Sequence, residues 1–340
     1  MAYTTINKSG DYFNTLTYTG DDGTNRSITG VGFQPDFIWF KDRSNAFNHY
    51  LFDIIRDGQT YYISSNNNAA EAADTTSLKS MDSDGFTVGA SAGVNGNNNN
   101  YVAWNWKANG TGAANTAGSI NSTVSVNTTS GFSIVKYTGT GSAATVGHGL
   151  GVKPDMIFSK PYSTTGDWNI YHDSFSSQQR IKLNSTGAVS TNSGIFSSLP
   201  TSTLVNIGTS GDINANGTAH LFYCFNSVQG FSKFGTYTGN GNADGTFVYT
   251  GFKPEFVMIK LDGADGWMML DNKRDPFNVM DKYMTANGSG ADTTRVTSDF
   301  VSNGFKLRTS NGDVNNGSYI YMAFAEAPLV GTNNVPANAR

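Results

Sequence analysis

Gly251-Phe-Lys-Pro-Glu-Phe-Val-Met-Ile-Lys260 has two close counterparts earlier in the chain, Gly32-Phe-Gln-Pro-Asp-Phe-Ile-Trp-Phe-Lys41 and Gly151-Val-Lys-Pro-Asp-Met-Ile-Phe-Ser-Lys160. A Tyr-Thr-Gly triplet begins 17 residues before each Pro, at Tyr18, Tyr137 and Tyr237. An apolar segment closed by an acid follows each copy, at Asp53, Asp173 and Asp271. Each copy ends in an aromatic-rich segment that starts at Tyr101, His220 or Tyr319. These repeated spacings predict three copies of one structural unit.

The spacing of the copies, 119 and then 100 residues between the prolines, is too long for a solenoid repeat of about 20–50 residues. We therefore expect each copy to be a domain of its own. The short apolar runs that follow each Pro are typical of strands buried on both faces. Gly, Asn, Asp and Ser clusters separate many such runs, which favours antiparallel sheets. The predicted fold is all-β, with three tandem antiparallel β-sandwich domains of the jelly-roll or lectin-like kind.

Domain boundaries follow from changes in composition. We expect the first domain at residues 1–108, the second at 121–228, the third at 229–330 and a polar tail at 331–340. Residues 109–120 are small and polar, which predicts a flexible linker. Because no such gap separates the second and third domains, we expect those two to pack closely and the first to move relative to them.

The composition excludes several classes of protein. Among 340 residues only 14% are charged, and the net charge of −4 gives no basic footprint for nucleic acid. There is neither a secretory signal pattern nor an apolar run long enough to span a membrane. The single cysteine, Cys224, lies in an apolar segment and cannot form an intramolecular disulfide, so we expect a buried thiol.

The three copies together resemble a repeat found in many marine bacteriophage virion proteins. The resemblance rests on motifs such as Tyr249-Thr-Gly-Phe-Lys-Pro-Glu-Phe-Val-Met-Ile-Lys260, Tyr101-Val-Ala-Trp-Asn-Trp-Lys107 and Gly166-Asp-Trp-Asn-Ile-Tyr-His172, and it covers roughly residues 10–328. Such proteins are usually described as tail fibres or have no known function. The resemblance implies a virion component that is assembled in the host cytoplasm.

Three functions are compatible with this resemblance. The first is a non-enzymatic tail-fibre or receptor-binding appendage, and the alternative is a capsid decoration or cement protein. A glycan-cleaving appendage is the third. Because sustained heptads and short shaft repeats are missing, a compact appendage fits better than a long fibre.

The residues give little support for catalysis or for a metal. A glycosidase needs two opposed carboxylates, yet the three glutamates, Glu71, Glu255 and Glu326, are scattered over the repeats. The repeated Asp53, Asp173 and Asp271 are better explained as scaffold. The four histidines lie in separate segments without metal-ligand spacing. We therefore expect neither a catalytic centre, nor a metal, nor a cofactor.

Aromatic residues are the best candidates for ligand binding. Trp168 and Trp267 occupy matching positions in polar loops, beside Asp167 and Asp265, and His49 takes this place in the first copy. A tryptophan in such a loop can stack on a sugar while neighbouring acids bind hydroxyls. The alternative is that each indole covers the core of its own domain.

The expected partners follow from the fold and from the resemblance. Apolar strands with few surface charges tend to associate edge to edge unless the edges are covered. Symmetric oligomers are a common solution, so we predict a homo-oligomer, a trimer first of all. The other expected partners are virion proteins of tail or capsid and a host surface glycan.

Overall fold

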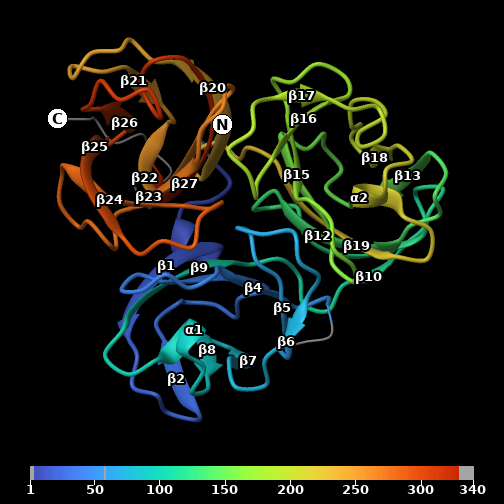
Figure 1. The fold of residues 1–340 in the computed structure, drawn as a ribbon, viewed down its shortest axis with the longest axis horizontal. Helices are drawn as coiled ribbons and strands as arrows, with labels where there is room; N and C mark the ends of the chain where they lie inside the picture. The colour runs from blue at the N-terminus through green and yellow to red at the C-terminus, as the bar shows by residue number, and fades with distance from the viewer. Residues whose placement is uncertain (1–3, 57–58, 329–340) are drawn as a thin grey trace.

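The computed structural model describes residues 4–56 and 59–328, and the expected polar tail at 331–340 lies outside these ranges. Three lobes surround a common centre (Figure 1), one for each repeat. We call them unit 1 (residues 4–108), unit 2 (109–228) and unit 3 (229–328). All pairings between named strands are antiparallel in the described residues, so the predicted all-β class is confirmed.

Unit 1 contains two sheets that face each other. The first has the strand order β1-β9-β3-β4, the second has the order β2-β8-β7, and β5 pairs with β6. The elements are η1 (Ser9–Asp11), β1 (Phe13–Thr19), β2 (Arg26–Thr29), β3 (Phe37–Asp42), β4 (Tyr50–Asp53), β5 (Tyr61–Tyr62), β6 (Ala72–Ala73), β7 (Leu78–Asp82), β8 (Gly85–Val88), α1 (Ala92–Asn95) and β9 (Asn100–Trp106).

Unit 2 has one large sheet, of order β10-β11-β12-β19-β14-β15-β16-β17, and a small sheet of β13 and β18. The elements are β10 (Ala113–Asn115), β11 (Ser122–Asn127), β12 (Phe132–Thr138), β13 (Ala144–Gly147), β14 (Met156–Pro161), β15 (Asn169–His172), β16 (Gln179–Lys182), β17 (Ser190–Thr191), β18 (Leu204–Ile207), α2 (Gly211–Asn214) and β19 (Ala219–Phe225).

Unit 3 differs because its strands form one continuous order, β20-β27-β22-β23-β24-β25-β26-β21, which curls into a near-barrel. The elements are β20 (Ser232–Thr238), β21 (Phe247–Tyr249), β22 (Phe252–Leu261), β23 (Trp267–Asp271), β24 (Met280–Thr285), β25 (Thr293–Val301), β26 (Gly304–Leu307) and β27 (Ser318–Pro328).

One four-stranded arrangement recurs in all three units: β1-β9-β3-β4, β12-β19-β14-β15 and β20-β27-β22-β23. Its register also recurs, since Tyr18, Tyr137 and Tyr237 lie opposite Tyr101, His220 and Tyr319. Pro35 and Pro154 lie two residues before the first residue of β3 and β14, whereas Pro254 lies inside β22 at a register shift. A bulge accommodates a residue that has no N–H for the ladder. The repeated spacing therefore corresponds to a repeated strand topology.

Each recurring sheet is buried on both faces. In β3, Ile38 and Phe40 enter a core that belongs to unit 1 alone, whereas Phe37 and Trp39 enter a core shared by all three units. This alternation is the period of two expected for a strand. Units 2 and 3 follow the same plan, each with a private core on the opposite face. The continuous apolar runs in the sequence reflect this double burial.

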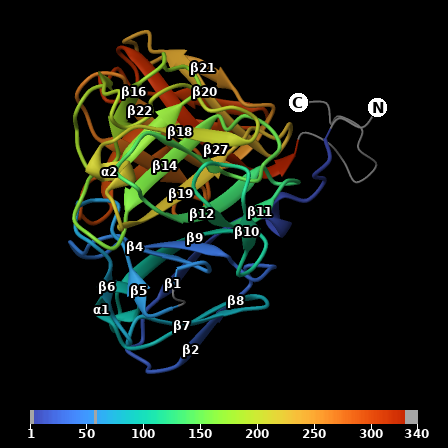
Figure 2. The same ribbon diagram turned by 90° about the vertical axis from the view of Figure 1, so that its right-hand side faces the viewer.

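The shared core lies where the three lobes meet. Rings from different units pack directly there, with centroids 4.2 Å apart for Phe37 and Tyr223 and 4.7 Å apart for Phe13 and Phe324. Figure 2 shows unit 1 packed beneath the other two units. The expectation that unit 1 moves independently is therefore wrong for this structure, because separation would expose the shared core to water.

The segment expected as a flexible linker, residues 109–120, is also ordered. It contains β10, which pairs with β11, and the side chain of Ile120 is buried. Its small and polar composition reflects a peripheral position on the sheet of unit 2. The segment adds strands to unit 2 as well as connecting it to unit 1.

Candidate functional site

Trp168 was the first candidate for sugar stacking, and the structure buries it completely. Its indole Nε1 donates a hydrogen bond to the carbonyl of Ser64 in unit 1, at 2.8 Å. Its backbone N–H donates to Asn184 Oδ1 at 2.9 Å. The ring therefore lies at the contact between units 1 and 2, and neither of its faces is open to a ligand.

Trp267 occupies the equivalent place in unit 3. Its Nε1 donates to the carbonyl of Lys182 in unit 2 at 2.8 Å, and its backbone N–H donates to Asn287 Oδ1 at 2.8 Å. The side chain is buried in the shared core. Both indoles thus lie between units, whereas the alternative considered for them was burial within their own domain.

His49 stands where the tryptophans stand in the other units. Its Nε2 lies 3.2 Å from the carbonyl oxygen of Thr285 and 3.1 Å from that of Gly288, both in unit 3. Its Nδ1 accepts a hydrogen bond from Trp39 Nε1 at 2.8 Å, so the proton of the neutral ring is on Nε2. Burial and the neighbouring Lys41 lower the pKa of His49 to about 3, which keeps the ring neutral.

These three contacts close a ring around the molecule. Unit 2 donates to unit 1, unit 3 donates to unit 2, and unit 1 donates to unit 3. The accepting residues Ser64, Lys182 and Thr285 are equivalent. Each lies two positions before an asparagine, Asn66, Asn184 or Asn287, whose Oδ1 accepts from the backbone N–H of His49, Trp168 or Trp267 in the same unit. A head-to-tail contact that closes after three steps is the pattern of a cyclic trimer, here formed within one chain.

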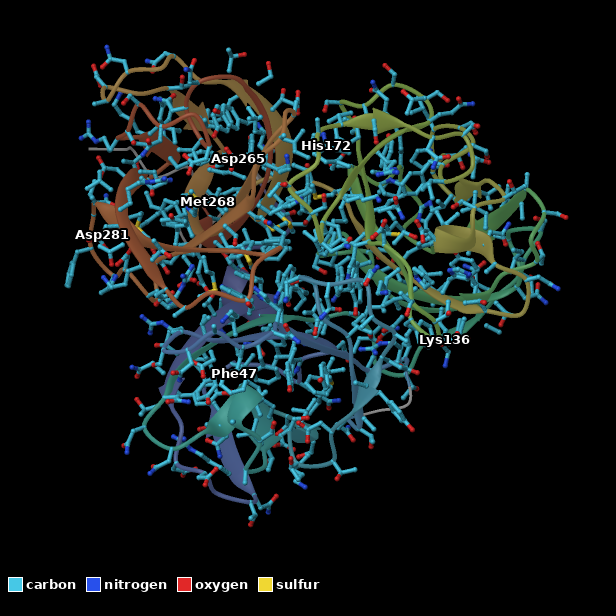
Figure 3. The ribbon with its side chains drawn as sticks, viewed as in Figure 1. Phe47, Lys136, His172, Asp265, Met268 and Asp281 are labelled. Carbon is cyan, nitrogen blue, oxygen red and sulfur yellow. The ribbon has the colours of Figure 1, made fainter. Side chains whose placement is uncertain are left out.

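The acids beside the tryptophans are structural in this arrangement. Asp167 forms an ion pair with Lys182 and accepts a hydrogen bond from Asn184 at 2.9 Å. Burial opposes ionisation of Asp167, but these two bonds outweigh it and lower the pKa. Asp265, labelled in unit 3 in Figure 3, accepts a hydrogen bond from the backbone N–H of Gly266 at 2.7 Å. The structure does not bring the four candidate residues together into one site.

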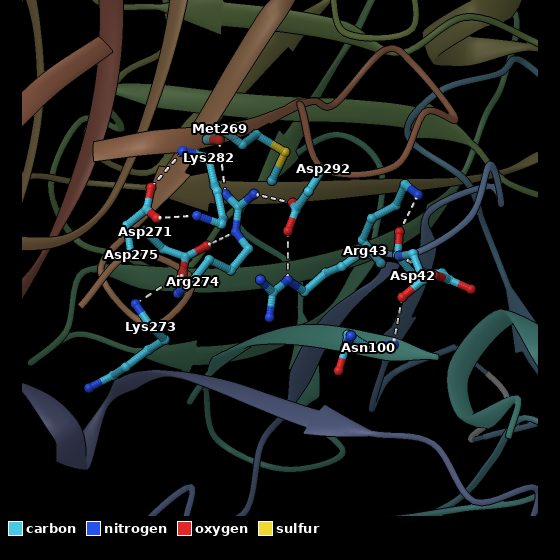
Figure 4. A network of polar contacts seen from close by, with 12 residues as sticks. Asp42, Arg43, Asn100, Met269, Asp271, Lys273, Arg274, Asp275, Lys282 and Asp292 are labelled. Atoms are coloured by element: carbon cyan, nitrogen blue, oxygen red, sulfur yellow. Dashed lines mark hydrogen bonds and ion pairs between the residues drawn. The ribbon is translucent and has the colours of Figure 1, made fainter. Parts of the chain in front are cut away.

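Two seams contain a buried Asp–Arg pair that joins neighbouring units. In unit 3, Arg274 binds Asp271 at 2.6 Å and Asp292 at 2.8 Å, and Asp292 also binds Arg43 of unit 1 at 2.8 Å (Figure 4). Burial disfavours the charge of Arg274, but the two carboxylates outweigh it and raise the pKa. In unit 1, Arg56 binds Asp53 at 2.6 Å. The same buried Asp–Arg pair, three residues apart in the sequence, is thus present in both units.

The third seam, between units 2 and 3, lacks this pair. Its aspartate, Asp173, is about half exposed and forms an ion pair with Lys153. Ser176 takes the place of the arginine. At the other two seams the aspartate also accepts a hydrogen bond from Tyr223 or Trp104 of the neighbouring unit, and Met322 of unit 3 takes the place of these donors. The ring is therefore not equally polar at its three contacts.

The repeated lysines fix the loops that follow them. The ammonium groups of Lys41, Lys160 and Lys260 are buried and donate to backbone carbonyls, including those of Asp42, Gly166 and Gly263. Lys160 also donates to the Asn68 carbonyl of unit 1 at 3.1 Å. Burial lowers the pKa of each lysine to about 8.

Two concave surfaces lie at the seams. The β20 groove, about 440 Å³, is lined by Thr236–Thr238 of unit 3 and by Ser174, Phe175 and Gln179 of unit 2. The β1 groove, about 340 Å³, is lined by Asn14–Thr17 of unit 1 and by Asn272 and Lys273 of unit 3. Hydroxyl and amide side chains predominate in the β20 groove and make up half of the residues that line the β1 groove. The two grooves occupy equivalent positions in the ring.

A repeated asparagine was not predicted from the sequence. Asn95, Asn214 and Asn315 are fully buried, and the side-chain amide of each binds the exposed loop that follows the Tyr-Thr-Gly tyrosine. The hydroxyl of each tyrosine donates to the carbonyl of the residue just before the asparagine. The nearly constant spacing from the tyrosine to the asparagine, 77, 77 and 78 residues, is the feature of the sequence that identifies this asparagine as part of the repeat.

Within residues 4–56 and 59–328, no group of three or more His, Cys, Asp or Glu side chains is arranged to hold a metal ion. No helix in this part of the chain is long and apolar enough to cross a membrane.

The fold and its seams define a class: an antiparallel β protein in which three repeated units close into a ring around a shared core. The chain belongs to a family described as a domain of unknown function (DUF7483), whose model matches residues 8–328. No curated protein matches the chain. No solved structure matches it either.

Proposed function

We propose that this protein is a non-enzymatic structural component of a bacteriophage virion, of the tail-fibre or receptor-binding type. The resemblance of its repeats to marine phage virion proteins supports the proposal. The observation that carries it is the closed ring, because it presents equivalent surface loops, such as those after Tyr18, Tyr137 and Tyr237, three times on one molecule. In this proposal the units act as lectin-like β modules of a compact appendage.

The loops after Tyr18, Tyr137 and Tyr237 are the best-placed binding elements. Their tips are exposed, while Asn95, Asn214 and Asn315 hold their backbones from inside. Loops fixed before binding lose little conformational entropy when a ligand arrives. Three copies on one particle raise weak single-site affinity through effective concentration. A host surface glycan is the proposed ligand of this surface.

A capsid decoration protein is the second candidate, and the ring itself favours it. A single chain with three similar faces matches a site where three identical capsid subunits meet. The expected homotrimer remains a prediction in either role. In one chain the ring already forms a threefold assembly, so light scattering of the purified protein distinguishes a single ring from a trimer of rings.

Locating the protein on particles tests the proposal. Purified virions of a phage that encodes this chain are analysed by mass spectrometry and labelled with an antibody against the ring. Label at the tail supports the receptor-binding role, and label over the capsid supports decoration. Absence of the protein from purified virions would contradict both roles.

A further inference from the structure

The equivalent strands β1, β12 and β20 each lie at one side of the recurring four-stranded sheet, but they differ in what covers them. In unit 2, β11 pairs with β12 along its length, from Ser122 opposite Tyr137 to Asn127 opposite Phe132. Among the described strands, β1 pairs with β9 alone and β20 with β27 alone, so each ends its sheet. The chain thus covers one of three equivalent edges.

The outward groups of β1 can be assigned from its neighbours. The bonds from Gly20 N to the Asn99 carbonyl and from Lys107 N to the Tyr12 carbonyl show that even-numbered residues face β9. Odd-numbered residues therefore face away. Two of these outward backbone groups already have a partner within the chain. Thr15 N donates to Glu255 Oε1 at 2.5 Å, and the Thr19 carbonyl accepts from Arg26.

Within the described residues, four of the outward groups of Thr15, Thr17 and Thr19 have no hydrogen-bond partner: N and O of Thr17, O of Thr15 and N of Thr19. β20 repeats this pattern. Phe234 N donates to Ser227 Oγ at 3.2 Å and the Thr238 carbonyl accepts from Thr246 at 2.8 Å. The groups equivalent to the four on β1 are N and O of Thr236, O of Phe234 and N of Thr238, and they too have no partner in the described part of the chain.

Space for a strand accompanies both edges. Thr236–Thr238 line the β20 groove, and Asn14–Thr17 line the β1 groove. In unit 2 the equivalent residues, Lys136–Thr138, line a third pocket together with Asn121–Thr123, which lead into and begin β11. In unit 2 the strand β11 lies beside this edge, with Ser122 opposite Tyr137 and Thr123 opposite Lys136.

We propose that β1 and β20 are docking edges, each of which binds one extended strand from a partner polypeptide by β-sheet extension. The occupant resembles β11, Ser-Thr-Val-Ser-Val-Asn, whose small hydroxyl residues suit grooves lined by threonine, serine and asparagine. Main-chain bonds give such a complex its affinity and side chains give it specificity. The β11 segment itself is already used on β12, so the strand comes from another polypeptide. This inference does not depend on the virion role.

A peptide of residues 119–127, labelled with fluorescein, is the probe for the intact protein. We expect saturable binding at two sites by fluorescence anisotropy. N-methylation of Thr123, whose counterpart on β12 is Lys136, should weaken binding at least tenfold. N-methylation of Val124, which faces β10 in the chain, is the matched control and should leave affinity unchanged.

Amide exchange gives an independent readout. Binding should slow exchange at Thr17 and Thr236 at least tenfold, while Lys136 stays protected throughout. Failure of the peptide to bind at millimolar concentration, or equal losses from the two N-methyl peptides, would overturn the proposal. A concentration-dependent dimer that the peptide disrupts would assign the edges to a second copy of the chain and would also overturn it.

Discussion

The hydroxyl of Tyr223, in the last strand of unit 2, donates a hydrogen bond to the buried carboxylate of Asp53 in unit 1 at 2.8 Å. Trp104 of unit 1 makes the equivalent bond to Asp271 of unit 3 at 3.2 Å. Each donor is the fifth residue of the last strand of its unit. Seam contacts of this kind join the three repeats, so we expect them to unfold together.

Replacing Tyr223 with Phe tests the first of these bonds. The variant keeps the ring that packs on Phe37 but removes one hydrogen-bond partner from Asp53. We expect the free energy of unfolding to fall by about 1–3 kcal/mol, measured by chemical denaturation. Tyr171→Phe is the control, because that hydroxyl binds the half-exposed Asp173, and it should change stability little. Equal effects would contradict the assignment.

Asp271 and Asp173 occupy the same repeat position in opposite environments. Asp271→Asn leaves the buried Arg274 with reduced compensation, so we expect a loss of about 3–5 kcal/mol. Asp173→Asn should stay within about 0.5 kcal/mol, because its ion pair is exposed. Denaturant titration of both variants measures the difference. A similar loss from both would show that the repeat position matters more than burial.

Trp168→Ala and Trp267→Ala test the location of the indoles. Each should lower the free energy of unfolding by about 3–5 kcal/mol, because a large buried ring is removed from between two units. Phe277→Ala, at an 82% exposed side chain, should change it by less than about 0.5 kcal/mol. If the tryptophan variants kept their stability but lost adsorption to host cells, the rings would be binding residues instead.

His49 makes one seam sensitive to acid. Its pKa is about 3 in the folded protein and about 6.5 when unfolded, so the unfolded chain binds more protons between these values. Stability must therefore fall as the pH falls from 6.5, by about 1.4 kcal/mol per pH unit from this residue. His49→Gln should reduce the slope by that amount in denaturation series at pH 7, 6 and 5. An unchanged slope would contradict the pKa.

A single unit should not fold alone. Residues 1–108 expressed by themselves would expose Phe37, Trp39 and Trp104, which enter the shared core in the ring. We expect aggregation or strong binding of a hydrophobic dye, and a single unfolding transition for the full chain by calorimetry. A monomeric fragment with a cooperative transition would show that the units are independent domains.

Local patterns in the sequence were sufficient to predict the strands and their repetition. The run from Phe37 to Phe40 identified a strand buried on both faces, and the spacing from Tyr18 to Pro35 placed it in a repeated unit. These features depend on residues close together in the chain, whose periodicity reflects backbone geometry. The repeated Asp was interpreted as scaffold because it recurs at the same position in all three copies.

Only the tertiary structure decided what the second face of each sheet packs against. The polar loop around Trp168 is compatible with an exposed surface that stacks on a sugar and with a buried contact between units. Which of the two forms depends on Ser64, 104 residues away in the sequence. Likewise, Arg274 and Ser176 distinguish the sequence neighbours of Asp271 and Asp173, but whether each carboxylate is buried depends on the unit that packs against it. Such contacts arise when distant strands meet, because burial is a property of the surfaces that exclude water together and not of either segment alone.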